Sequence, residues 1–330
     1  MSERPTLSDL LSTAVPFAVP LHREFRGLRL REGVLIQGPS GWGEFAPFDD
    51  YSDVAAARWL ESAIEAAYGQ WPEPVRPDVP VNAILPAVPS ALAADLTRAA
   101  VIDHGCTTIK VKVGSADLAD DEARVAAVRE VLTELLGAGR GSIRIDANGA
   151  WDVERGRQAL ACLAAFDLEY VEQPCRTREE LVDLRSRVDV RFAVDELIRW
   201  ADEPVTGVRD VADVAVLKPA TLGGVEATLR LAERLDVPVV VSGSLDTSVG
   251  LATSIAAAAA LPDLPYACGL GTGTLLADDL GQPVLPGGGR VPVERVFPDE
   301  PALERARARI GEERASYWHQ RLAAAWSVKG

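Results

Sequence analysis

Lysine is scarce in this sequence. Of its 330 residues, 34 are lysine or arginine, and only Lys110, Lys112, Lys218 and Lys329 are lysines. The other 30 are arginines, as a codon bias towards Arg and Ala would produce. A lysine that persists against such a bias is a candidate for a role that arginine cannot fill, because only the lysine ammonium can readily give up its proton.

The sequence also lacks the features of several protein classes. Four scattered cysteines show no CxxC spacing, so we expect small buried side chains rather than a metal or redox site. No run of 18 uncharged apolar residues occurs, and the start lacks the pattern of a signal peptide, so we expect a cytoplasmic protein. A formal charge of −15 disfavours nucleic acid or an anionic membrane as a partner, and no obligate protein partner is indicated.

Eight short β-branched runs alternate with helical stretches from about residue 80 onward. Strict alternation of strand and helix predicts a parallel sheet with crossover helices. Eight units in about 190 residues favour a closed barrel over an open sheet. The runs are residues 81–85, 108–113, 142–146, 170–173, 192–196, 214–218, 239–243 and 266–270.

Polar residues at or next to one end of successive runs repeat with the length of one strand–helix unit. Residues at this period occupy equivalent places around a barrel, near the mouth where barrel enzymes keep their chemistry. The residues are Asp146, Glu172, Asp195, Lys218, Ser242 and Tyr266, at intervals of 26, 23, 23, 24 and 24.

The segments outside the barrel follow other patterns. Over residues 1–79, turns rich in Pro and Gly between short apolar runs predict antiparallel strands followed by a helix, which together form an α+β capping domain. Residues 80–284 are then the barrel. Residues 285–330 end in a charged helix, which we expect to return to the capping domain.

Three of the lysines lie at the predicted mouth. Lys110 and Lys112 are two residues apart and therefore share one face of a strand. Because a barrel strand has no exposed face, inward lysines need anionic or metal-organised neighbours. Three successive runs end in Asp146, Glu172 and Asp195, whose charges would repel unless they were neutralised. Oxygen donors without His or Cys suit Mg²⁺.

Lys218 follows one unit later. Three carboxylates and three lysines at one mouth suit the removal of a proton next to a carboxylate. In such a reaction the substrate carboxylate binds Mg²⁺, the metal stabilises the enediolate, and a lysine takes the proton. A nearby metal ion and a second ammonium would lower the lysine pKa from its reference value of about 10.4 towards that of a useful base.

The motifs K-x-K, D-x-N, V-E-Q-P and D-E and the later lysine, in this order, resemble the muconate-lactonising subgroup of the enolase superfamily over the whole chain. The resemblance implies an α/β fold, a modified TIM barrel of (β/α)₇β type with a capping domain, Mg²⁺ as cofactor and a small dicarboxylate as substrate. It excludes a histidine base, because His22, His104 and His319 do not end a barrel strand. By matching positions it implies Asp146, Glu172 and Asp195 as Mg²⁺ ligands, Lys112 as base with Lys110 in support, Lys218 as the opposite lysine, and Asn148 as a polar contact.

Within the subgroup, the short chain, the trimmed capping segment and the late runs VSGSLDTSVGLA and PYACGLGTGTLLADDL resemble o-succinylbenzoate synthases of high-GC Gram-positive type. The D-x-D of dipeptide epimerases is missing. The resemblance implies a lyase that dehydrates 2-succinyl-6-hydroxy-2,4-cyclohexadiene-1-carboxylate with syn geometry, a step towards menaquinone. An N-succinylamino acid racemase, a muconate-type cycloisomerase and a non-catalytic anion-binding barrel are the alternatives.

Loops after the last two runs are predicted to bind the succinyl carboxylate through backbone N–H groups, although turn geometry would also explain their glycines. These substrate contacts are Ser242, Gly243, Ser244, Gly269, Leu270 and Gly271.

Two further groups of residues have open roles at this point. Arg144 shares the strand face of Asp146, and we expect it either to reach the metal carboxylates or to form a structural ion pair one layer deeper. In the capping domain, Phe17, Phe25, Arg26 and Phe48 are candidates for closing the barrel mouth over the substrate.

Overall fold

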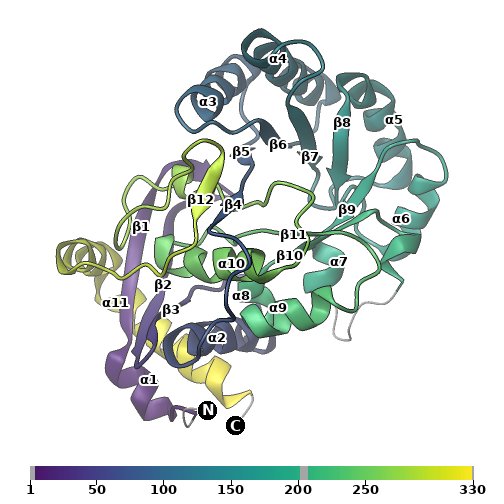
Figure 1. Ribbon diagram of the computed structural model, residues 1–330. Coiled ribbons are helices and arrows are strands. Elements are labelled where there is room, and N and C mark those ends of the chain that lie inside the picture. The colour runs from purple at the N-terminus through teal and green to yellow at the C-terminus, as the bar shows by residue number, and fades with distance from the viewer. Residues whose placement is uncertain (1–3, 201–206, 329–330) are drawn as a thin grey trace.

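Seven parallel strands curl around a common axis in the computed structural model, which describes residues 4–200 and 207–328 (Figure 1). Each strand pairs with its neighbour in the sequence, as successive right-handed crossovers produce. The strands are β5 (Ala83–Leu85), β6 (Thr108–Lys112), β7 (Ser142–Asp146), β8 (Leu168–Glu172), β9 (Phe192–Val194), β10 (Val214–Leu217) and β11 (Val239–Val241). The predicted modified barrel is confirmed as this curled parallel sheet.

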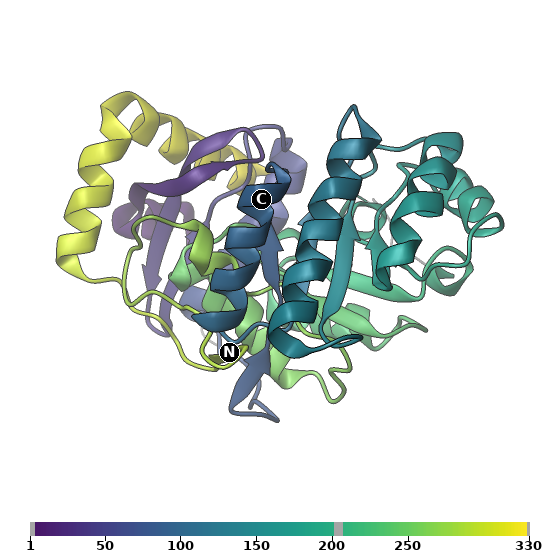
Figure 2. The ribbon, with the colours of Figure 1, turned by 90° about the horizontal axis from the view of Figure 1, so that it is seen from above.

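Helices connect the strands and cover the outside of the sheet (Figure 2). None of those in the described part of the chain has the length and apolarity needed to cross a bilayer. The helices are α3 (Ser90–Ile102), α4 (Leu118–Leu136), α5 (Val153–Leu163), α6 (Arg178–Arg185), α7 (Glu196–Arg199), α8 (Pro219–Leu222), α9 (Val225–Ala232) and α10 (Ser248–Ala260), with 3₁₀ turns η1 (Ala164–Phe166), η2 (Val208–Asp210) and η3 (Thr272–Leu275).

The prediction of an eighth strand over residues 266–270 is wrong. This segment makes one bridge on each side, from Cys268 to Val81 and from Gly269 to Ser242. Backbone hydrogen bonds of 2.7 to 3.0 Å hold it between the two edges of the seven-stranded sheet. A Cβ atom at Gly269 would lie 2.5 Å from the Ser242 hydroxyl oxygen, so the close approach depends on glycine. Cys268 and Gly269 therefore form a two-residue seam that closes the ring of strands.

The capping region contains an antiparallel three-stranded sheet, as the N-terminal pattern predicts. Helix α11 packs against β1 and α2, and a small sheet joins β4 to β12. The division at residues 79/80 and 284/285 stays a prediction. The elements are α1 (Leu7–Thr13), β1 (Val15–Phe25), β2 (Leu28–Gly38), β3 (Gly41–Phe45), α2 (Asp53–Tyr68), β4 (Asp78–Pro80), β12 (Arg290–Pro292) and α11 (Glu300–Ser327).

Side chains alternate in character along β6 and β7. Ile109, Val111, Ile143 and Ile145 are fully buried in the hydrophobic core of the barrel. Between them along the strands, Lys110 is paired with Arg144 in the register, and Lys112 with Asp146. Because successive strand residues point to opposite faces, these charged residues all lie on the inner face of the curled sheet.

Replacing Gly43 with alanine is expected to destabilise the capping region. Gly43 lies in β3 against α2, and a Cβ atom there would lie 1.9 Å from the carbonyl oxygen of Ala63, which belongs to a helix backbone and cannot simply rotate away. We expect a loss of about 3 kcal/mol, measured as the free energy of unfolding in urea. Gly287→Ala is the matched control, because no atom lies within 4 Å of its Cβ position. Equal urea midpoints for the two variants would contradict the prediction.

Candidate active site

Three carboxylates meet at the carboxyl ends of adjacent strands. Asp146 ends β7, Glu172 ends β8 and Asp195 directly follows β9. Asp146 pairs with Glu172 in the register, so both lie at one level of the sheet, and all three residues are almost completely buried. The period of 23 to 26 residues in the sequence therefore corresponds to a real juxtaposition.

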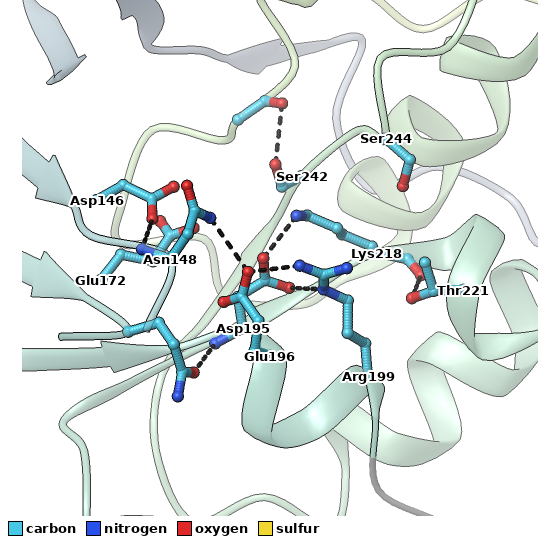
Figure 3. A network of polar contacts seen from close by, with 12 residues as sticks. Asp146, Asn148, Glu172, Asp195, Glu196, Arg199, Lys218, Thr221, Ser242 and Ser244 are labelled. Carbon is cyan, nitrogen blue, oxygen red and sulfur yellow. Dashed lines mark hydrogen bonds and ion pairs between the residues drawn. The ribbon is translucent and has the colours of Figure 1, made fainter. Parts of the chain in front are cut away.

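Each of the three carboxylates contacts a lysine ammonium. Lys110 Nζ lies 2.9 Å from Glu172 Oε1 and 3.2 Å from Asp146 Oδ2. Lys112 Nζ donates to Asp146 Oδ2 at 2.6 Å and to Asn148 Oδ1 at 2.8 Å. Lys218 Nζ, from the residue after β10, lies 2.6 Å from Asp195 Oδ2 (Figure 3). Lys329 lies outside the described residues.

These contacts shift the proton affinities in opposite directions. Although burial alone would lower the pKa of Lys110, the charges of Glu172 and Asp146 raise it, so this lysine stays protonated. Burial lowers the pKa of Lys112, the adjacent Lys110 charge lowers it further, and Asp146 only partly compensates. The Lys112 side chain is also the most exposed of the three, at 15% compared with 12% for Lys218 and 6% for Lys110. Lys112 therefore gives up its proton more readily than an ordinary lysine.

A network of polar contacts connects the two ends of the site (Figure 3). Asn148 Nδ2 donates to Glu196 Oε1 at 3.1 Å, and the same oxygen accepts a hydrogen bond of 2.5 Å from Arg199. Arg199 Nε also donates to Asp195 Oδ1 at 3.1 Å, and its third nitrogen donates to the Tyr51 hydroxyl of the capping region. Arg199 thus joins the capping region to a carboxylate of the site.

Sequence reasoning assigned no role to Glu196, Arg199 or Tyr51. The signal for two of them was present, because Arg199 stands three and four residues after Glu196 and Asp195, the spacing of one helical turn. Tyr51 gave no such signal, since it comes from a segment that is far away in the sequence and packs its ring against Phe48 and Trp59.

The lysines line one pocket with most of the predicted substrate contacts. Leu270 is not part of this wall, since its side chain is fully buried in the barrel core. Phe25, Arg26 and Phe48 close the pocket from the capping region, whereas Phe17 is buried inside that region. The wall also holds the predicted Asn148, Ser242, Gly243, Ser244, Gly269 and Gly271, and the unpredicted Asn82, Ile84, Leu245 and Thr272.

Arg144 forms the structural ion pair that was one of its two expected roles. Its Nε donates to Glu169 Oε2 at 2.5 Å, and Nη1 donates to Asn82 Oδ1 at 3.0 Å and to the Ala267 carbonyl at 2.7 Å. Its guanidinium also lies over the Tyr170 ring, 4.7 Å from the centroid. Arg144 therefore connects side chains that lie below the carboxylates with Ala267, the residue before the two-residue seam.

The acidic side chains fit a hard divalent cation by donor type and by charge. Burial, together with the neighbouring Asp146 charge, raises the pKa of Glu172 to about 7, so a further positive charge here would be stabilising. Among residues 4–200 and 207–328, no three Asp, Glu, His or Cys side chains are arranged as a metal-binding group. The ammonium groups of Lys110 and Lys112 both contact Asp146 Oδ2, and that of Lys218 contacts Asp195 Oδ2.

Comparison with known proteins agrees with this geometry. Residues 16–67 match the family model for enolase N-terminal domain-like sequences, and residues 92–301 match that for enolase C-terminal domain-like sequences. A muconate lactonizing enzyme from Pseudomonas fluorescens has a similar solved structure, with a TM-score of 0.75 at 21% identity, covering 89% of this chain and 97% of that one.

Two curated relatives are much closer in sequence. An o-succinylbenzoate synthase from Thermobifida fusca is 51% identical over 319 residues, covering 95% of this chain and 96% of the relative. Another from Mycobacterium ulcerans is 46% identical over 327 residues, covering 98% and 96%. With a matching pair of enolase-like domains and such identity over nearly the full length, this chain belongs to the o-succinylbenzoate synthase family of the enolase superfamily.

Proposed function

We propose that this chain is a lyase that converts 2-succinyl-6-hydroxy-2,4-cyclohexadiene-1-carboxylate into o-succinylbenzoate and water, a step of menaquinone biosynthesis. The names of its relatives support the activity. The observation that carries the proposal is the placement of Lys112 and Lys218 on one pocket, although β7, β8 and β9 lie between their strands. The whole chain carries a formal charge of −15, but three lysines place positive charge in the pocket, which suits a small dicarboxylate. We expect the enzyme to act in the cytoplasm without an obligate partner.

The pocket lysines divide the chemistry between them. Lys112 Nζ takes the proton from the carbon that bears the carboxylate, and the electron pair left behind forms the new ring double bond as the C–O bond breaks. The resulting ammonium returns the proton to the departing hydroxide on the same face, so the products are the aromatic ring and water. The Lys218 ammonium stabilises the negative charge that develops on the substrate. Lys110 holds Glu172 and Asp146 in place.

Asp146, Glu172 and Asp195 are the residues that would hold Mg²⁺, which when bound supplies positive charge to the substrate carboxylate. We therefore expect MgCl₂ to stabilise the fold, by about 2.7 kcal/mol at roughly a hundredfold excess over Kd, and EDTA to reverse the effect. The shift of the unfolding temperature measures this without any substrate. Asp195→Asn is expected to abolish the shift, and Asp183→Asn, at a surface carboxylate that pairs with Arg187, to retain it. A shift that survives in Asp195→Asn would mean that Mg²⁺ binds elsewhere.

The activity itself is tested directly with the cyclohexadiene substrate. Its absorbance should fall as o-succinylbenzoate forms, and addition of EDTA should stop the reaction. Absence of turnover with Mg²⁺ present would overturn the proposal.

An N-succinylamino acid racemase is the second candidate, because a racemase needs an acid/base group on each face of the substrate and this pocket holds both Lys112 and Lys218. Incubation of N-succinylamino acids in D₂O distinguishes the two reactions. Inversion with deuterium incorporation, without dehydration of the cyclohexadiene, would favour the racemase.

A further inference from the structure

A second cavity, of about 330 Å³, adjoins the catalytic pocket. Its walls come from the end of β1, from β5 and α3, and from the segment around η3, so it lies between the capping region and the barrel. Phe25, Ile84 and Gly271 contribute to both cavities. Its volume is in the range of small-molecule sites, which often occur where two structural units meet.

The inner wall of this cavity is apolar. Leu85 and Ala100 are buried, and Leu96, Ala99 and Leu275 add further aliphatic surface. Cys106 is buried there too, and burial raises the pKa of its thiol to about 11, so it stays uncharged near neutral pH and behaves as a small apolar group. This wall suits a flat or branched hydrocarbon body.

The polar side chains on the wall include a basic arginine and two histidines. Although the chain has 49 acidic and 34 basic residues, the described residues that line this cavity include no Asp or Glu, but they do include His22, Arg23 and His104. His104 Nδ1 lies 3.2 Å from the Pro286 carbonyl oxygen, which fixes the ring and leaves Nε2 for another partner. Arg23 is exposed to solvent at the edge of the cavity, and no ion pair joins it to another residue in the described part of the chain.

Two of the nearby acids, Glu24 and Asp278, contact other arginines. Glu24, next to Arg23 in the sequence, lies 3.4 Å from Arg29. Asp278, in the adjoining groove, contacts Arg305 at 2.9 Å and Arg309 at 2.7 Å. Neither of these two acids pairs with Arg23.

We propose that this cavity binds an organic anion with an apolar body, such as an aromatic carboxylate, at a site separate from the catalytic pocket. The guanidinium of Arg23 offers paired donors to a carboxylate, and the ring fits against the wall formed by α3 and η3. The proposal rests on this cavity alone and stands whether or not the chain catalyses the dehydration.

The experiment uses 2-naphthoate as the probe and measures its affinity and stoichiometry by titration calorimetry. The intact protein is expected to bind one equivalent. Arg23→Gln and Ala99→Phe, which remove the anion contact and fill the cavity respectively, are each expected to weaken binding by at least about tenfold, the equivalent of 1.4 kcal/mol. Arg29→Gln, on the same hairpin but outside the cavity, is the matched control.

A catalytic-pocket variant separates the two cavities. Lys112→Gln is expected to leave the affinity for 2-naphthoate unchanged, because Lys112 lines only the catalytic pocket. If Lys112→Gln abolishes binding while Arg23→Gln does not, the probe occupies the catalytic pocket and the proposal fails. It also fails if no binding occurs, or if Ala99→Phe keeps both the native unfolding temperature and full affinity.

Discussion

The Lys112→Ala variant is expected to dehydrate the cyclohexadiene substrate about 10³-fold more slowly, measured as kcat. Lys112 combines a lowered pKa, the greatest exposure among the three site lysines and a direct hydrogen bond to Asn148. Lys112→Arg should be similarly inactive, because guanidinium keeps the charge but does not give up its proton. That pair of variants separates proton transfer from simple charge stabilisation.

Lys218 provides the contrasting case. Lys218→Ala should lower kcat by about 10²-fold through loss of a positive charge beside the substrate, whereas Lys218→Arg should recover part of the activity. Circular dichroism and the urea midpoint check that each variant folds. Near-full activity of Lys112→Ala or of Lys218→Ala would contradict the assigned roles.

A large loss of stability is expected for Arg144→Ala. Arg144 is completely buried, and its removal leaves Glu169, Asn82 and the Ala267 carbonyl without their shared partner. Breaking this largely buried charge pair, together with two further hydrogen bonds, should cost about 3 kcal/mol, seen as a lower free energy of unfolding in urea.

An ion pair nearer the surface is the matched control for Arg144. Arg185 contacts Asp213 at 2.6 Å, but both side chains are about one-third exposed. Arg185→Ala should therefore cost about 1 kcal/mol or less. Equal losses for the two variants would show that Arg144 does not support the barrel interior.

Much of the site could be predicted because its residues recur once in every strand–helix unit of the barrel. A strand–helix unit has a nearly fixed length, so Asp146, Glu172 and Asp195 could be placed at one level before any coordinates were known. The inward direction of Lys110 and Lys112 followed from strand periodicity. The role of Arg144 could only be narrowed to two options, because the sequence does not show which acid lies within its reach.

Other features depend on packing between distant segments and left no local pattern. The run at 266–270 has the composition of a strand, yet only two of its residues fit between β5 and β11. Tyr51 reaches Arg199 from 148 residues away in the sequence. The second cavity exists only because the end of β1 meets α3 and η3. Periodicity describes single elements, whereas these features arise where elements meet.

The two-residue seam has a consequence for the order of folding. Strands β5 to β11 pair with sequence neighbours, so each pairing closes only a short loop, but the bridge from Val81 to Cys268 joins residues 187 positions apart. Closing so long a loop in an unfolded chain costs much entropy, and the few hydrogen bonds of the seam give little in return. The cost is smaller once the intervening strands have paired and brought the two ends close together. The open half-ring should therefore form first. Gly269 and Gly271 should then join Lys112 and Lys218 in the pocket wall only when the ring closes.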